Sequence, residues 1–426
     1  MSDEQSELKA ARIGELARRL SHLSGAPNDT EVFVFWIPGR IEVLGKHTDY
    51  GGGRSLLCAV ERGICLVARA RSGTPTRSES PRVRIMDANS GDIAEFDLAA
   101  NVEPRPGHWS NYPITVARRA AANFSGAMSG ADIVFASDLP PAAGVSSSSA
   151  LVVGSFLAIA AVNDLPARHE YRDNITTKED LAGYLGCVEN GLNFKSLHGH
   201  AGVGTFGGSE DQTAILCAIP NSLVQYSFCP VRFERAIPLP RDYSFVIGAS
   251  GVLAEKTGAA LQLYNGVSRR LSVALECWRS ASGRPDISMG AAVASSGDAR
   301  ERIRAILVAS RSAEYPAQSL VDRFDQFVVE ANEIIPAAGD ALIRGDLDAF
   351  GDAVARSQLG AQNHLENQIP ETIALVRGAR DLGAAAASAF GAGFGGSVWA
   401  LVESRSVVVF RQKWSNAYHR AFPGNK

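Results

Sequence analysis

The feature that most constrains the fold is the mixture of strand-like and helix-like segments in both halves of the chain. Short β-branched and aromatic runs, typical of strands, are separated by longer runs with apolar residues at helical spacing. We expect strands at Val32 to Ile37, Ile64 to Ala68, Asp132 to Ala136, Tyr243 to Gly248 and Val398 to Val402. We expect helices at 7–22, 150–162, 178–193, 210–218, 256–279, 300–311, 319–335, 339–357, 371–382 and 407–421. The pattern predicts an α/β or α+β fold.

The length of the chain and a proline-rich segment near its middle indicate two domains. A chain of 426 residues exceeds what one compact core usually holds. Pro230, Pro238 and Pro240 bracket a change of character, after which a buried strand begins. We therefore expect an N-terminal domain over 1–235 and a C-terminal domain over 236–426.

Charge and cysteine content exclude several classes of partner and compartment. The net charge of -3 gives no reason to expect nucleic acid or an anionic membrane as a partner. The six cysteines form no C-x-x-C pair, which is typical of buried thiols in a reducing cytosol. No secretory signal precedes the first helix, and no apolar run is long enough to span a bilayer. We expect a cytoplasmic protein, and the sequence indicates no particular oligomeric state.

A first glycine-rich segment, Pro38 to Gly53, places five strongly polar side chains directly after a predicted strand. Arg40 can contact a phosphate or a carboxylate, and Asp49 can accept hydrogen bonds from hydroxyl groups. The alternative is a solvated polar turn, which composition alone favours.

A second segment, Leu139 to Leu151, lies between a predicted strand and an apolar helix and contains serine at each of positions 146–149. The N–H groups at a helix N-terminus and the helix dipole favour an anion there, and serine hydroxyls can bind phosphate or reach Mg²⁺. The segment lacks the lysine of the G-x-x-x-x-G-K-[ST] loop. One serine would suffice to cap the helix, so the run of four favours phosphate binding.

Two further segments give weaker patterns. Phe390 to Ser397 is a glycine-rich turn before a strand, which alone indicates no more than a bulge or close backbone packing. Glu210 and Asp211 begin an apolar helix, where helix capping is the default explanation of an acidic residue.

Together and in order, these segments resemble the galactokinases, within the GHMP kinase superfamily. Pro38 to Gly53 is similar to the family pattern P-G-R-[IV]-N-[LI]-[IL]-G-E-H-T-D-Y-x-G-G, with Glu42 and Lys46 in place of its Asn and Glu. Gly144 to Ala150 resembles G-[LM]-[SG]-S-S-[AS], and Gly391 to Gly396 resembles G-x-G-F-G-G.

The resemblance implies a two-domain fold with an active site in the cleft between the halves, and ATP-dependent phosphorylation of a sugar at its anomeric hydroxyl. Asp211 would be the catalytic acid or base, or would orient the hydroxyl. Arg40 would hold Asp211 ionised and stabilise charge on the phosphoryl group. Ser147 and Glu189 would bind Mg²⁺. The phosphates of ATP would contact Gly144, Ser146, Ser147, Ser148 and Ser149.

The same resemblance places the sugar against Lys46, His47, Asp49 and Tyr264. In galactokinases, the Glu at the position of Lys46 and the His that follows contact the sugar near its C6 hydroxyl. An ammonium group could still donate to a neutral hydroxyl, but it would also pair well with a carboxylate at C6. The implied partners are a small-molecule sugar and ATP, with neither nucleic acid nor membrane.

Three alternatives stand beside a kinase for galactose or a galactose-like sugar. Lys46 raises a kinase for a galactose-like uronic acid or another modified sugar. A sensor that binds sugar and ATP without turnover would be expected to have a damaged serine segment, whereas 146–148, Arg40 and Asp211 are intact. A superfamily kinase for a non-sugar alcohol is disfavoured by the run His47 to Tyr50, which resembles sugar kinases.

Overall fold

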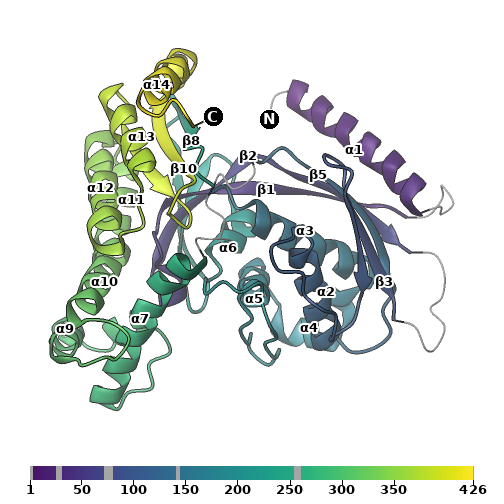
Figure 1. The fold of residues 1–426 in the computed structure, drawn as a ribbon, viewed down its shortest axis with the longest axis horizontal. Helices are drawn as coiled ribbons and strands as arrows, with labels where there is room; N and C mark the ends of the chain where they lie inside the picture. Colours follow the sequence, from purple (N-terminus) through teal and green to yellow (C-terminus); the bar gives the residue numbers. More distant parts are fainter. Residues whose placement is uncertain (1–2, 25–30, 72–79, 141–143, 254–260, 426) are drawn as a thin grey trace. The chain divides into compact units, whose positions relative to one another are not determined.

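The structure is a computed structural model that describes residues 3–24, 31–71, 80–140, 144–253 and 261–425. The described chain contains both strands and helices in each half, which confirms the expected mixed α/β class (Figure 1). None of the described helices combines the length and the apolar character needed to cross a membrane.

Two compact units interleave along the chain. The first comprises Met1–Gly39, Val60–Pro141 and Ser146–Gly204, and the second comprises Arg40–Ala59, Ala142–Val145 and Thr205–Lys426. The interleaving follows from two strands, β1 (Phe33–Leu44) and β2 (Arg54–Ala70), each of which begins in one unit and ends in the other. The boundary expected at residue 235 stays a prediction.

The sheet of the first unit runs β4-β3-β5-β2. Strands β3 and β5 are parallel, whereas β4 pairs with β3 and β2 pairs with β5 in antiparallel register. Besides β2, its strands are β3 (Arg82–Asp87), β4 (Ile93–Asp97) and β5 (Ala131–Ser137). The helices are α1 (Asp3–Ser24), α2 (Asn111–Asn123), α3 (Ser147–Val162), α4 (His169–Asn174) and α5 (Lys178–Asn190).

Helices cover both faces of this sheet, which explains why the part of β2 from Ile64 to Ala68 is apolar and buried at every position. Leu16 of α1 belongs to the same buried cluster as Cys65 and Val67 of β2. On the opposite face, Leu66 approaches Gly154 of α3, where an added Cβ would lie 3.1 Å from the leucine side chain. Since successive side chains of a strand point to opposite faces, two covered faces require apolar residues at every position.

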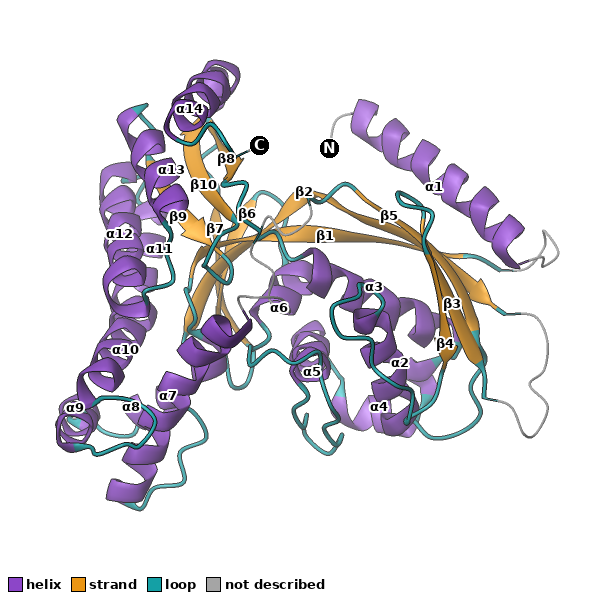
Figure 2. Cartoon of the chain, viewed as in Figure 1, coloured by secondary structure: helices purple, strands orange, loops and turns teal. Residues whose placement is uncertain are grey.

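The second unit contains, within the described residues, one sheet in which β2 pairs with β6 and β6 with β7, and another with the order β8-β10-β9 (Figure 2). Its strands are β6 (Ser222–Ser227), β7 (Arg232–Pro238), β8 (Tyr243–Ala249), β9 (Ala386–Phe390) and β10 (Ser397–Glu403). Its helices are α6 (Glu210–Cys217), α7 (Leu261–Ser282), α8 (Met289–Val293), α9 (Ala299–Ala309), α10 (Ala317–Val329), α11 (Ile335–Ile343), α12 (Leu347–Gly360), α13 (Pro370–Asp381) and α14 (Val407–Ala421).

The three-stranded sheet is also covered on both faces. Val398 and Ala400 of β10 pack into a cluster with Trp414 of α14. Between them, Trp399 is fully buried and stacks on Phe350 of α12, with ring centroids 6.4 Å apart. The alternation of large and small side chains along β10 therefore matches one helix layer on each side.

Several elements differ from their expected bounds. Strand β1 does not end at Pro38 but continues to Leu44, because the run that follows Pro38 is buried and pairs with β2. The helix expected over 339–357 is interrupted at Gly345, whose φ is 72°, and α12 begins after Asp346, which caps it. The segment 281–299, where no helix was expected, contains the short helix α8. The expected helix over 256–279 begins, among the described residues, at Leu261.

Candidate active site

Arg40 and Asp211, which the sequence predicted to act together, are in contact within the second unit. Arg40 is on β1 and only 1% exposed. Its Nε donates to Asp211 Oδ1 at 2.8 Å, its Nη2 lies 2.6 Å from the same oxygen, and its Nη1 donates to the carbonyl of Gly144. Burial lowers the pKa of Arg40, but Asp211, Glu210 and Glu42 outweigh this effect and raise it. The guanidinium is therefore a permanent positive charge beside the carboxylate.

Asp49 contacts the residue that precedes Asp211. It begins the short 3₁₀ turn η1 (Asp49–Gly51), and its Oδ2 accepts the N–H of Glu210 at 3.0 Å. A Cβ on Gly208 would lie 2.3 Å from the same oxygen, so only glycine lets the backbone approach this closely. The contact places Asp49 near the start of helix α6, where Asp211 lies.

His47 connects the first glycine-rich segment to the third. Its Nε2 lies 3.0 Å from the carbonyl oxygen of Ala392, and its Nδ1 lies 3.1 Å from the Tyr50 hydroxyl. The ring of Tyr264, which is buried, lies with its centroid 5.4 Å from that of His47. The predicted sugar residues His47 and Tyr264 are therefore neighbours.

Lys46 is 2% exposed and points to serine hydroxyls. Its Nζ donates to Ser388 Oγ on β9 at 2.7 Å and to Ser357 Oγ on α12 at 3.1 Å. Ser357 in turn donates to Glu330 Oε1 at 2.8 Å, and the same oxygen accepts the N–H of Gly45 at 3.0 Å. Among the residues that the structure describes, no carboxylate forms a direct ion pair with Lys46.

Glu42 is the electrostatic partner of Lys46. Its Oε2 accepts the N–H of Gly391 at 3.1 Å, and its Oε1 is buried with no hydrogen-bond partner among the described residues. Burial raises the pKa of Glu42 to about 7, while the positive charges of Lys46 and Arg40 act in the opposite direction. The two residues that depart from the galactokinase pattern are therefore coupled to each other.

Sequence reasoning missed the residues that support this segment from behind. Arg323 Nη2 donates to the carbonyl of His47, and Gln326 Nε2 donates to that of Lys46 at 3.3 Å. Arg323 and Gln326 are on α10, and both are buried. Arg323 and Gln326 lie between apolar residues of α10, and this position was the signal that could have revealed them in the sequence. The other residues that support the segment are Glu330, Ser357 and Ser388.

The serines at positions 146–149 belong to the first unit, whereas Gly144 and Val145 belong to the second. Ser146 has a φ of 58°, its buried Oγ has no hydrogen-bond partner among the residues that the structure describes, and α3 begins at Ser147. Ser149 Oγ donates to Glu189 Oε2 at 2.9 Å. Glu189 therefore contacts the serine run two residues beyond the predicted metal ligand Ser147, while Ser147 and Ser148 are partly exposed.

Comparison with known proteins gives a consistent result. The galactokinase galactose-binding signature matches residues 25–70, the GHMP kinases N terminal domain matches 111–192, and the GHMP kinases C terminal model matches 340–420. A galactokinase from Roseiflexus sp. (strain RS-1) is 28% identical over 387 residues, which cover 90% of this chain and 87% of the relative. The chain is a galactokinase-like member of the GHMP kinase superfamily.

Other proteins resemble this galactokinase-like chain over most of its length. A galactokinase from Actinobacillus pleuropneumoniae is 26% identical over 386 residues, covering 90% of this chain and 88% of the relative. The fold matches that of Lactococcus lactis galactokinase, crystallised with galactose, with a TM-score of 0.76, 23% identity and coverage of 97% and 96%. Methanococcus jannaschii mevalonate kinase matches with a TM-score of 0.53, 13% identity and coverage of 92% and 96%. The chain is therefore a kinase of the galactokinase type, in a family that uses ATP.

Proposed function

We propose that this kinase transfers the γ-phosphoryl group of ATP to the anomeric hydroxyl of galactose or a closely similar neutral sugar. The contact between Arg40 and Asp211 is the observation that supports it most. In this proposal, Asp211 accepts or orients the proton of the attacking hydroxyl, and Arg40 fixes the carboxylate and stabilises charge on the moving phosphoryl group.

Three residues of the second unit are suited to bind the sugar. Asp49, which accepts the N–H of Glu210 at the start of α6, can also accept hydrogen bonds from hydroxyl groups. His47 and Tyr264 lie beside each other. We propose that all three contact the sugar hydroxyls.

The surroundings of Lys46 support a neutral substrate rather than a uronic acid. Two serine hydroxyls accept its hydrogen bonds, and Glu42 supplies opposite charge within the protein. A substrate carboxylate would have to share this ammonium with Glu42 and with Glu330, which is linked to it through Ser357. An internally compensated charge gains less from a second anion.

The serine segment is proposed to bind the phosphates of ATP. The N-terminus of α3, a helix of 16 residues, offers backbone N–H groups there, and the buried hydroxyl of Ser146 has no partner within the described part of the chain. Ser147 and Glu189 provide a hydroxyl and a carboxylate, the hard oxygen ligands that Mg²⁺ prefers. Bound there, Mg²⁺ would neutralise charge on the phosphates.

A substrate panel tests the proposal. Galactose, galacturonate and glucose would each be incubated with ATP and Mg²⁺, with ADP release as the rate and ³¹P NMR to locate the phosphate. We expect galactose 1-phosphate, and a kcat/KM for galactose that exceeds that for galacturonate by at least about tenfold, because the carboxylate of galacturonate would be desolvated beside an ammonium that the protein already compensates. Preference for galacturonate would support the uronic acid alternative instead, and binding of both galactose and ATP without ADP release would support the sensor.

A further inference from the structure

The end of the first glycine-rich segment packs directly on α8, a short helix that the proposed chemistry does not use. A Cβ on Gly290 of α8 would lie 2.2 Å from the carbonyl oxygen of Gly52, and a Cβ on Gly52 would lie 2.4 Å from Ser288 Oγ. Real side chains do not approach this closely, so glycine is required on both sides. The backbone of Gly290 therefore lies directly against the backbone of Gly52, which also packs on the Ser288 side chain, and close packing of this kind transmits a shift.

Gly52 in turn closes the turn that holds Asp49. Its N–H donates to the carbonyl of Asp49 at 3.0 Å, and its φ of 78° places it in the left-handed region. Asp49 Oδ2 accepts the N–H of Glu210, the neighbour of Asp211. A displacement of Gly52 would therefore reach Asp49 through a single short turn.

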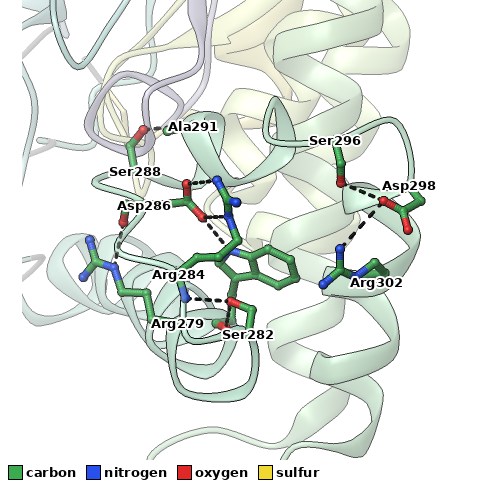
Figure 3. A network of polar contacts seen from close by, with 10 residues as sticks. Arg279, Ser282, Arg284, Asp286, Ser288, Ala291, Ser296, Asp298 and Arg302 are labelled. Atoms are coloured by element: carbon green, nitrogen blue, oxygen red, sulfur yellow. Dashed lines mark hydrogen bonds and ion pairs between the residues drawn. The ribbon is translucent and has the colours of Figure 1, made fainter.

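The loop that leads into α8 is held by a clamp, defined as the hydrogen bonds of Asp286 with Trp278 and Arg284 (Figure 3). Asp286 Oδ2 accepts from Trp278 Nε1 at 2.8 Å and from Arg284 Nε at 2.8 Å, and Oδ1 accepts from Arg284 Nη2 at 3.0 Å. Trp278 is fully buried among α7, α9 and α10. Two residues after Asp286, Ser288 caps α8 by accepting the N–H of Ala291 at 3.1 Å. The clamp thus ties the start of α8 to the helical core.

We propose that α8 is a positioning element for the sugar: the clamp at Asp286 holds Gly290 against Gly52, and this contact sets the position of Asp49. The inference depends on the proposed function, in which Asp49 contacts the sugar. Asp286 is then a positioning residue, which acts through the two glycines and touches no substrate.

A pair of matched glycine variants tests this role. Gly290→Ala adds a methyl group against the Gly52 carbonyl, whereas Gly297→Ala adds one where no atom lies within 4 Å. We expect Gly290→Ala to raise the KM for galactose by about tenfold or more while the KM for ATP changes by less than about twofold, because misplacing a positioning group affects only the ligand that it holds. Gly297→Ala should change neither KM.

A milder variant keeps the experiment informative if Gly290→Ala does not fold. Asp286→Asn removes the charge of the clamp and leaves the glycine contact sterically unchanged, so the galactose KM should rise by a smaller factor, again with little change for ATP. Equal changes in both KM values, or changes that only follow the loss of thermal stability, would overturn the inference.

Failure of the proposed function would be visible separately, as a wild-type protein that does not phosphorylate galactose. Calorimetric titration of galactose and of ATP into the same variants would then test α8 without turnover. A selective loss of sugar affinity in Gly290→Ala would support the positioning role, and unchanged affinities would contradict it.

Discussion

Residue by residue, the candidate site consists of charges that have almost no access to water. Arg40, Glu42 and Lys46 are 1%, 3% and 2% exposed. Because burying an isolated charge is costly, each of them depends on its partners, and removal of one partner destabilises the other. A single substitution at one of these three residues should therefore destabilise the fold by more than the loss of its own hydrogen bonds, because it leaves another buried charge without a partner.

The contact between Arg40 and Asp211 gives a prediction about turnover. Asp211→Asn keeps the shape of the side chain and loses its charge, and Arg40→Lys keeps the charge and loses the fork that reaches both Asp211 and Gly144. Each should lower kcat by about 10²-fold or more, the usual contribution of acid–base and electrostatic groups, and change ATP affinity by less than about threefold. Steady-state kinetics and calorimetry measure the two quantities, and near-normal kcat in both variants would refute the assignment.

Glu42 gives a prediction about stability and pH. Burial raises its pKa from 4.5 to about 7 in the folded protein. Between these values the folded state holds a proton that the unfolded chain has released, so the contribution of Glu42 to stability falls as pH rises through this window and then levels off. The wild type should therefore lose unfolding free energy relative to Glu42→Gln from about pH 4.5 to about pH 7.

Urea denaturation of both proteins at several pH values measures this difference. Glu7→Gln, on the exposed face of α1, serves as the control and should follow the wild type at every pH. Parallel stability curves for wild type and Glu42→Gln would show that Glu42 titrates alike in the folded and unfolded states.

At the level of elements, two serines in the first turn of α3 are expected to have different roles, one as a Mg²⁺ ligand and one as a structural hydrogen-bond donor. Ser147→Ala should raise the Mg²⁺ concentration needed for half-maximal activity, because the proposed hydroxyl ligand is lost. Ser149→Ala should instead leave Glu189 without this donor and lower stability by about 1–3 kcal/mol. A Mg²⁺ titration and a denaturation curve for each variant separate the roles. A changed Mg²⁺ requirement in Ser149→Ala alone would move the ligand from Ser147 to Ser149.

The elements that the sequence predicted best are those with a strong periodic pattern. Helix α14 and strand β8 agree with expectation to within a residue or two, because their apolar residues recur at one spacing throughout. Strand β1 was expected to end at Pro38, since proline disfavours a central strand, but pairing with β2 extends it. The break at Gly345 and the appearance of α8 depend on turn conformation and on packing, which local periodicity does not contain.

Across the whole molecule, the sequence predicted candidate site residues but not the residues that hold them in place. Arg40 and Asp211 were recognised from local motifs and lie 171 positions apart in the chain. The support Ser357 lies between Arg356 and Gln358, Ser388 lies in an alanine-rich run, and no motif marks either of them. Their importance follows from tertiary packing alone, as does the interleaving of the two units.

Glu42 of β1 and Lys46, just after β1, contact residues that are far away in the sequence, and this separation has a consequence for biosynthesis. The hydrogen bonds from Lys46 to Ser388 and from Gly391 to Glu42 join residues 342 and 349 positions apart. A ribosome releases β1 long before it releases β9. On the nascent chain, we therefore expect these charged side chains to remain hydrated, because their partners in and after β9 have not yet been made. We therefore expect the proposed sugar end of the site to be completed late in folding. A prematurely terminated chain without β9 would leave Lys46 with no hydroxyl from Ser388. We expect quality-control proteases to degrade such a chain as incompletely folded, so that it would not accumulate as a weakly active enzyme.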